Sequence, residues 1–156
     1  MSQNPYQAPN ANISNNDSQH VYAGFWIRFV ASLIDTLFLV VIMSTALFAI
    51  YGEAYFTAER TGSFGIWDMF FSYIMPIIIV IVFWVYRSGT PGKLILGIKI
   101  VDQKTGGKLT VGQSILRYIG YYISILPLML GFLWVAFDKK KQGWHDKISG
   151  TVCIKS

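Results

Sequence analysis

An arginine and an aspartate lie inside the most apolar stretch of this sequence, where charged side chains are rare. Arg28 and Asp35 stand in GFWIRFVASLIDTLFLVVIMSTALFAIY, which is long enough to cross a bilayer. A charge at the centre of a membrane costs about 3 kcal/mol even on lenient insertion scales. The two residues are seven positions apart, nearly two helical turns, so they share one face with Ser32 between them. The pattern indicates a membrane-embedded protein whose polar stripe faces protein or water rather than lipid.

These two charges differ in how easily they reach the membrane surface. Arg28 stands beside Trp26 near the start of the stretch, so a structural explanation is that its guanidinium snorkels to the headgroups. Asp35 has a short side chain and lies about 10 Å deeper by helical rise, which predicts a partner or a water-filled cavity. The candidate partners are Arg28 itself and Arg117 from a later apolar zone. A paired Asp35 is either a structural link between helices or the titrating group of a proton or cation path, and the sequence leaves both open.

A second polar cluster lies near the C-terminus, in FDKKKQGWHDK. Residues 139–141 are all lysine, which is typical of a charged exit from a membrane. Histidine titrates near neutrality, so His145 beside Asp146 suggests a metal site or a proton relay. The only other histidine is His20, and no further His/Cys cluster or nucleophile–base arrangement is present, so we expect no metal, no cofactor and no enzyme. The candidate functional network is therefore Arg28, Asp35, Arg117, Asp138, His145 and Asp146.

The composition supports a small membrane protein of one domain. The chain has 156 residues, of which 53% are hydrophobic and only 13% charged, against about 25% charged in soluble domains. Its basic residues lie between apolar spans, which favours membrane topology and anionic lipid over nucleic acid as the reason for the net positive charge. Residues 1–20 are rich in Asn, Gln, Ser and Pro and lack the pattern of a secretory signal. We expect them to form a disordered tail before a membrane domain at residues 21–156.

Three apolar zones follow the tail, at about residues 24–50, 69–86 and 111–137. The first two meet the length criterion for transmembrane helices, and Pro76 predicts a kink in the second. The third contains Arg117, Pro127 and Gly131. It forms either a single kinked span or two short helices that meet at Pro127 and return to their own side.

The distribution of basic residues favours the second alternative. The connection between the first two zones contains one basic residue, Arg60, whereas the segment before the third zone and the C-terminal tail contain five each. The positive-inside rule places both of these segments, and the N-terminus, in the cytoplasm. This favours a helical hairpin or re-entrant element over a single span with the tail outside. The basic residues concerned are Arg87, Lys93, Lys99, Lys104, Lys108, Lys139, Lys140, Lys141, Lys147 and Lys155.

The segment before the third zone also has local structure of its own. Thr90 and Pro91 suit a helix start, as N-cap and first helical residue. Residues 98–101 have strand character, Gly106 and Gly107 supply a turn, and residues 108–111 suit a return strand. Residues 151–154 are expected to add to this hairpin. The predicted fold is an all-α membrane protein with a small cytoplasmic β cap.

Taken together, residues 22–154 resemble the RDD family of small integral membrane proteins, named for an arginine and two aspartates. The matching stretches are GFWIRFVASLID, GTPGKLILGIKIVD, LTVGQSILRY and FDKKKQGWHDKISGTVCI. The resemblance implies that Arg28 is the family's arginine and Asp35 its first aspartate. Asp146 is our choice for the second, with Asp138 as its rival. It also implies a location in the bacterial inner membrane.

Two functions follow from the residues and the resemblance. The first is transport of a small solute or ion, with a proton or cation acting through Asp35. Because two to four helices cannot enclose a path alone, it requires a homo-oligomer within the lipid bilayer. The second is a structural or accessory membrane protein whose polar residues lock the helices together and whose cytoplasmic face binds a partner. The sequence leaves both functions open.

Overall fold

The computed structural model describes residues 21–55 and 66–156, so the predicted tail at residues 1–20 and Arg60 lie outside the described part. The elements are α1 (Phe25–Tyr51), a 3-10 turn (Gly52–Tyr55), α2 (Ile66–Met69), a π-helical turn (Phe70–Ile74), α3 (Met75–Arg87), α4 (Pro91–Ile95), β1 (Ile98–Asp102), α5 (Val111–Ile125), α6 (Leu130–Phe137), α7 (Trp144–Ser149) and β2 (Thr151–Lys155).

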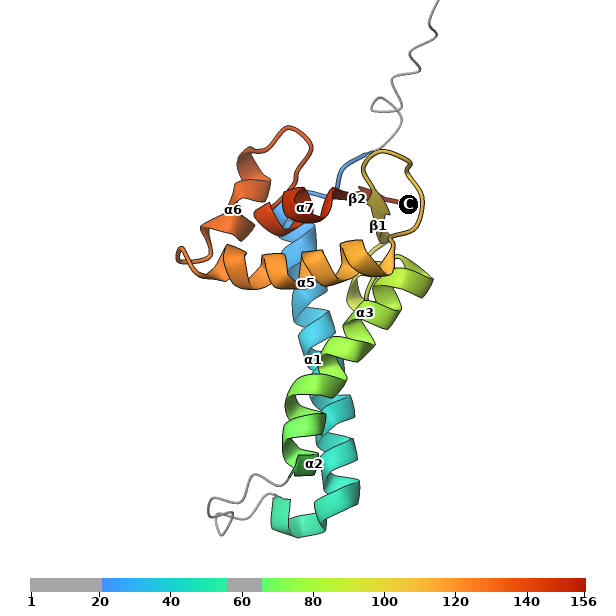
Figure 1. Cartoon of the computed structure of the whole chain (residues 1–156), viewed down its shortest axis with the longest axis vertical. Helices are drawn as coiled ribbons and strands as arrows, with labels where there is room; N and C mark the ends of the chain where they lie inside the picture. Colours follow the sequence, from blue (N-terminus) through green and yellow to red (C-terminus); the bar gives the residue numbers. More distant parts are fainter. Residues whose placement is uncertain (1–20, 56–65) are drawn as a thin grey trace, which may run out of the picture.

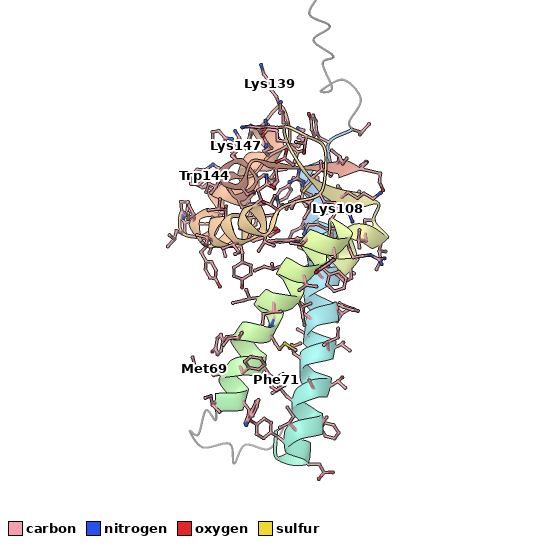
Figure 2. The ribbon with its side chains drawn as sticks, turned by 45° about the vertical axis from the view of Figure 1, so that its right-hand side comes forward. Met69, Phe71, Lys108, Lys139, Trp144 and Lys147 are labelled. Carbon is pink, nitrogen blue, oxygen red and sulfur yellow. The ribbon has the colours of Figure 1, made fainter. Side chains whose placement is uncertain are left out.

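These elements form a long stalk and a compact cap at one end of it (Figure 1). The stalk consists of α1, α2, the π-helical turn and α3; the cap contains α4 to α7 and both strands. Two helical segments of the described chain, Phe25–Tyr51 and Phe70–Ile95, are long and apolar enough to cross a membrane. Side chains project outwards along the stalk (Figure 2), and large apolar ones such as Leu37 and Val41 are exposed there. A surface of this kind suits lipid rather than water.

Pro76 lies in the first turn of α3, directly after the π-helical turn. A proline in a helix has no N–H to donate, and its ring collides with the carbonyl group four residues earlier. The π-helical turn is wider than an α-helical one, so it gives the proline ring space and relieves this collision. Where a kink was predicted at Pro76, the structure therefore has a π-helical turn.

The third apolar zone is two helices, α5 and α6, bent by 100° relative to one another. The turn between them contains Pro127 and two residues with positive φ, Leu128 at 51° and Met129 at 62°. Before this zone the chain forms β1 and after it β2, and these two strands pair. The zone therefore begins and ends at the same end of the molecule, as a returning element does. A straight span with its ends on opposite sides is not formed.

The two strands are antiparallel, with Ile98 opposite Lys155 and Asp102 opposite Thr151. The predicted return strand at residues 108–111 is wrong. Thr110 instead caps α5 by accepting a hydrogen bond of 3.2 Å from the Gln113 N–H, and the Gln113 side chain accepts one of 3.0 Å from the Thr110 N–H. This reciprocal pair makes residue 111 the start of a helix, so the partner of β1 is the C-terminal strand.

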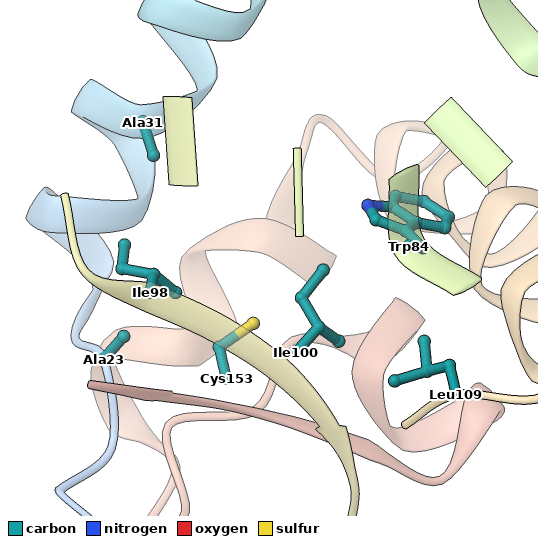
Figure 3. Close-up of a cluster of buried hydrophobic side chains, with 7 residues drawn as sticks. All are labelled: Ala23, Ala31, Trp84, Ile98, Ile100, Leu109 and Cys153. Carbon is teal, nitrogen blue, oxygen red and sulfur yellow. The ribbon is translucent and has the colours of Figure 1, made fainter. Parts of the chain in front are cut away.

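The main hydrophobic core lies where the cap meets the stalk (Figure 3). Trp84 of α3 is buried there, with Ile98 and Ile100 of β1 and Cys153 of β2. Ala31 of α1 completes the contact with the stalk. The short sheet is thus stabilised by packing on the first membrane-length helix and on the end of the second.

Candidate functional site

Asp146 lies between two arginines at the centre of the cap. Its Oδ2 is 2.5 Å from Nη1 of Arg28, and its Oδ1 forms an ion pair with Nη1 of Arg117. The three residues come from α7, α1 and α5, and are 0%, 8% and 1% exposed. One carboxylate therefore joins three helices that lie far apart in the sequence. We call Arg28, Arg117 and Asp146 the polar lock.

Local structure at the start of α7 holds Asp146 in place. Gly143 is the N-cap, and its N–H donates a 3.0 Å hydrogen bond to Asp146 Oδ2. An acidic residue in the first turn also interacts favourably with the helix dipole. Gly120 lets α5 approach closely, because a Cβ at this position would lie 2.8 Å from Cα of His145. The close packing of α5 on α7 brings Arg117 to Asp146.

The charge of Asp146 is fixed by its two partners. Burial alone would raise the pKa of Asp146, but the nearby guanidinium groups of Arg117 and Arg28 outweigh it and hold the pKa well below its usual range. Asp146 therefore stays ionised throughout the physiological pH range. With two arginines and one aspartate, the polar lock has a formal charge of 2 − 1 = +1. It is suited to holding helices together rather than to exchanging protons.

Arg28 is buried, and its side chain is directed into the protein. Besides its ion pair with Asp146, its Nε donates a 2.8 Å hydrogen bond to the carbonyl oxygen of Ala23. The guanidinium is thus bound on two sides by the chain itself. The snorkelling explanation for Arg28 is wrong.

Arg117 extends the lock to the sheet and to α3. Its Nη1 donates a 2.5 Å hydrogen bond to Oγ1 of Thr151 in β2, and its Nη2 lies 3.6 Å from Sγ of Cys153. The guanidinium carbon is 5.4 Å from the centre of the Trp84 ring, within cation–π range. A single side chain on α5 therefore contacts three other elements.

His145 packs against the lock as a neutral side chain. Its ring stacks on that of Tyr121, with a centroid distance of 4.4 Å, and lies tilted against that of Phe132 at 4.9 Å. Burial lowers the pKa of His145 to about 3, although Asp146 acts in the opposite direction. Within the described residues no group of three or more His, Cys, Asp or Glu side chains could hold a metal ion. The arrangement gives His145 a packing role.

Asp35 belongs to a separate cluster, and its predicted partners are wrong. Thr90 donates a 2.5 Å hydrogen bond from Oγ1 to Asp35 Oδ2, and the Gly92 N–H donates one of 2.6 Å to Oδ1. Lys93 Nζ lies 3.8 Å from Oδ2. Arg28 shares a helix face with Asp35 but is directed to α7, and Arg117 is bound in the cap. Asp35 instead binds the N-terminus of α4.

The docking of α4 on α1 requires a glycine. A Cβ on Gly92 would lie 2.3 Å from the carbonyl oxygen of Ala31 and 2.9 Å from the backbone nitrogen of Asp35. Thr90 is the N-cap and Pro91 the first helical residue, as predicted. The Thr90 hydroxyl, however, is turned to Asp35, which supplies the acceptor for the Gly92 N–H. One helix thus caps another.

Asp138 lies outside both clusters. Its Oδ1 is 2.5 Å from Nζ of Lys147, and its Oδ2 accepts hydrogen bonds of 3.1 Å from the backbone N–H groups of Lys140 and Gln142. It organises the loop before α7. Of the six predicted residues, the structure brings four together, namely Arg28, Arg117, His145 and Asp146, and separates Asp35 and Asp138 from them.

Sequence reasoning missed the residues that contact Asp35 and, apart from Asp146, those that contact Arg117. Thr90 was predicted as a cap for its own helix, Lys93 was counted only among the basic residues that indicate topology, and Gly92 had no predicted role. The sequence signal that could have revealed this contact is the GTPGK stretch. A glycine at the second helical position lets another backbone approach the helix closely. Thr151 was predicted only as part of a strand, and nothing in the sequence marks its contact with Arg117.

Comparison with known proteins finds relatives in several bacteria. The chain is 33% identical over 147 residues, 83% of this chain and 94% of the relative, to a Bacillus subtilis (strain 168) protein named uncharacterized protein YxaI. It is 33% identical over 144 residues, 86% of this chain and 82% of the relative, to uncharacterized membrane protein YteJ of the same organism. It is 26% identical over 108 residues, 67% of this chain and 43% of the relative, to the proline-rich antigen of Mycobacterium leprae (strain TN). No solved structure matches the chain. The sequence profile of the RDD family matches residues 22–150, and the chain belongs to the RDD family.

Proposed function

We propose that this protein is a structural or accessory membrane protein, in which two membrane-spanning helices hold a folded cap at the membrane surface for a partner to bind. The observation that carries the proposal is the double ion pair of Asp146 with Arg28 and Arg117, which joins α1, α5 and α7. All three side chains are buried within the chain. A network of this kind fixes the cap on the stalk and keeps its charged groups inside the protein.

The sequence of the stalk supports the same proposal. Residues 36–51 and 69–86 contain no Asp, Glu, Lys, Arg or His. A proton or cation that moved past Asp35 along the stalk would therefore meet no acidic, basic or histidine side chain of these segments over about 20 Å of helix. Ion-coupled transporters usually place such groups along their path.

The orientation that we propose places the cap and the N-terminus in the cytoplasm of a bacterial inner membrane. Residues 87–108 and 138–156, which contain five basic residues each, both lie in the cap or at its edge. The connection between α1 and α2 contains one basic residue. This asymmetry is the one that the positive-inside rule describes.

Transport remains the second candidate because of Asp35. Its carboxylate lies 3.8 Å from Nζ of buried Lys93, beside the break between α3 and α4. Interrupted helices near paired charges bind ions in several transporter folds. Since only two membrane-length helices are present in the described chain, this function requires a homo-oligomer.

One experiment separates the two candidates. The full chain is reconstituted into proteoliposomes, and flux is measured under imposed pH and sodium gradients for the wild type, Asp35→Asn and the neighbouring control Thr36→Val. Thr36 is exposed on α1 and its hydroxyl binds only the Ser32 carbonyl among the bonds described. The structural proposal predicts no flux in any of the three, and a lower unfolding temperature for Asp35→Asn alone. Wild-type flux that is lost in a folded Asp35→Asn variant would overturn it and establish transport.

A further inference from the structure

Helix α5 has the reverse of the usual arrangement of polar and apolar side chains. Its buried residues are Ser114, Arg117, Gly120 and Ser124, which face the rest of the cap. Its outward residues are apolar, and Leu116 and Ile119 are 47% and 49% exposed. A surface helix of a water-soluble protein buries its apolar stripe and exposes its polar one. The outward face of α5 therefore suits a hydrocarbon environment and not water.

This apolar face continues around the bend into α6. Leu126 and Leu128, at the turn, are 81% and 89% exposed, and Phe137 at the end of α6 is 82% exposed. The positive φ of Leu128 and Met129 is what turns the chain here. We call the outward apolar side chains of α5, the turn and α6 the apolar belt. It is far larger than the scattered single apolar residues of an ordinary soluble surface.

The direction of α5 decides how the belt meets a membrane. In Figure 1, α5 runs across the cap end of the stalk and crosses α1 rather than lying alongside it, and Figure 2 shows the molecule from another side. The apolar surface of the stalk begins directly below it. If α1 and α3 cross a bilayer, α5 lies along the plane of that bilayer, near one of its surfaces.

Length excludes the alternative in which this zone crosses the bilayer. Helix α5 has 15 residues and α6 has 8, so they are about 22 Å and 12 Å long. The hydrocarbon core is about 30 Å thick, and the two helices are bent by 100°. Neither helix alone, nor the pair, makes a straight span.

We propose that α5 and the turn after it form an interfacial unit, embedded in the lipid leaflet on the cap side of the membrane, that α6 runs from this unit away from the stalk towards the headgroups (Figure 1), and that the chain crosses the bilayer only twice. Helices that lie at the boundary between headgroups and acyl chains have an apolar face of this kind. The inference rests on the proposed function only in taking α1 and α3 as membrane spans.

Aromatic and basic side chains border the belt, as expected at a headgroup boundary. The ring centres of Trp134 and Trp144 are 6.4 Å apart, and Nζ of Lys147 lies 5.7 Å from the centre of the Trp134 ring. Tryptophan rings gather at membrane interfaces, and lysines interact with anionic headgroups there. These bordering side chains indicate that lipid, rather than a second protein, covers the apolar belt.

Depth measurements with nitroxide labels test the proposal. Single cysteines replace Leu116, Ile119 and Ile123 on the outward face of α5, in the full chain with Cys153→Ser, reconstituted in phosphatidylethanolamine/phosphatidylglycerol vesicles. Leu37→Cys in the stalk and Lys104→Cys in the cap are the controls for deep and water-exposed positions. Accessibility to oxygen and to a water-soluble nickel complex gives the depth of each label.

An interfacial helix predicts that the three α5 labels lie at the same shallow depth, about 5–10 Å below the headgroups. A spanning helix predicts instead that depth changes by about 10 Å from Leu116 to Ile123, which would overturn the proposal. Labels shielded from both reagents would mean that protein covers the belt, and labels open to nickel alone would mean that water does; either result overturns it.

The controls separate this inference from the proposed function. A shallow or water-exposed Leu37 label would show that the stalk does not cross the membrane, and both proposals would fail. A deep Leu37 label with α5 labels that are not shallow would overturn the interfacial unit alone. Flux through the wild type would overturn the structural function and leave the depth profile unchanged.

Discussion

One carboxylate compensates two buried guanidinium groups, so the polar lock depends on every charge it contains. Within the described part of the chain, Nη2 of Arg28 and Nε of Arg117 have no hydrogen-bond partner. The desolvation of both groups is therefore only partly offset. Loss of Asp146 would leave two cations facing one another without a counter-charge.

Asp146→Asn should destabilise the protein strongly, because the amide keeps the shape of the side chain and removes its charge. We expect a loss of about 3–5 kcal/mol in the free energy of unfolding, measured by thermal or denaturant unfolding in detergent. The matched control is Asp138→Asn. The partner of Asp138, Lys147, has a side chain 44% exposed, and such pairs contribute about 1 kcal/mol or less. Equal losses in the two variants would contradict the assignment of the lock to Asp146.

His145 should make stability depend on pH. Its folded-state pKa is lowered to about 3 by burial, whereas the unfolded chain binds a proton near pH 6.5. Stability is therefore complete above pH 6.5 and falls as the pH drops below it, by about 2 kcal/mol between pH 6.5 and pH 5. Aspartates contribute little in that window, because they titrate near pH 4 when unfolded.

The measurement is the unfolding free energy of the wild type and of His145→Gln at several pH values. The variant should lose the slope between pH 6.5 and pH 5, whatever its stability at neutral pH. A slope that persists in His145→Gln would assign the pH dependence to another group.

At the scale of elements, the contact of α4 with α1 depends on backbone proximity more than on charge. Gly92→Ala would place a Cβ 2.3 Å from the Ala31 carbonyl oxygen, which would push α4 away and break the hydrogen bond to Asp35. We expect a loss of about 2 kcal/mol or more, as for other overpacked sites. Unfolding in detergent measures it, together with the yield of folded protein in membranes.

Gly112→Ala is the control for this substitution. Gly112 is also in the first turn of a helix, but a Cβ there meets nothing within 4 Å. Alanine is favoured over glycine in helices, so this variant should be neutral or slightly more stable. If both variants behaved alike, close packing at Gly92 would not be the reason for the effect.

Local features of these elements were predictable, and long-range ones were not. The start of α4 at Thr90 and Pro91 depends on neighbouring residues alone and was correctly predicted. The partner of β1 was predicted only in part. Residues 151–154 were expected to add to the hairpin, but β2 is about fifty residues after β1, and the strand propensity of residues 108–111 wrongly made them the first choice. The hydrogen bonds between Thr110 and Gln113 cap α5, so residue 111 begins a helix instead of ending a strand. Likewise, Arg28 and Asp35 share a helix face, yet their partners depend on where α7 and α4 dock.

At the scale of the whole molecule, the two-strand sheet ties the middle of the chain to its end. Val21 lies beside β2 as well, since its carbonyl oxygen accepts a 2.8 Å hydrogen bond from the Lys155 N–H. The start of α1, the segment after α3 and the C-terminus therefore lie together in the cap. Any orientation in a membrane must place all three on one side.

Single-cysteine labelling tests that topology directly. In a Cys153→Ser background, cysteines replace Lys104 and Lys139 in the cap and Glu53 at the far end of α1, all of which are exposed. A membrane-impermeant maleimide added to spheroplasts should label Glu53→Cys at once, because the proposed orientation places this residue on the outer side. Lys104→Cys and Lys139→Cys should react only after permeabilisation, and both should react in inverted vesicles. Labelling of Lys139→Cys but not Lys104→Cys from outside would mean that residues 111–137 cross the bilayer. The pairing of β1 with β2 could not then exist in the membrane.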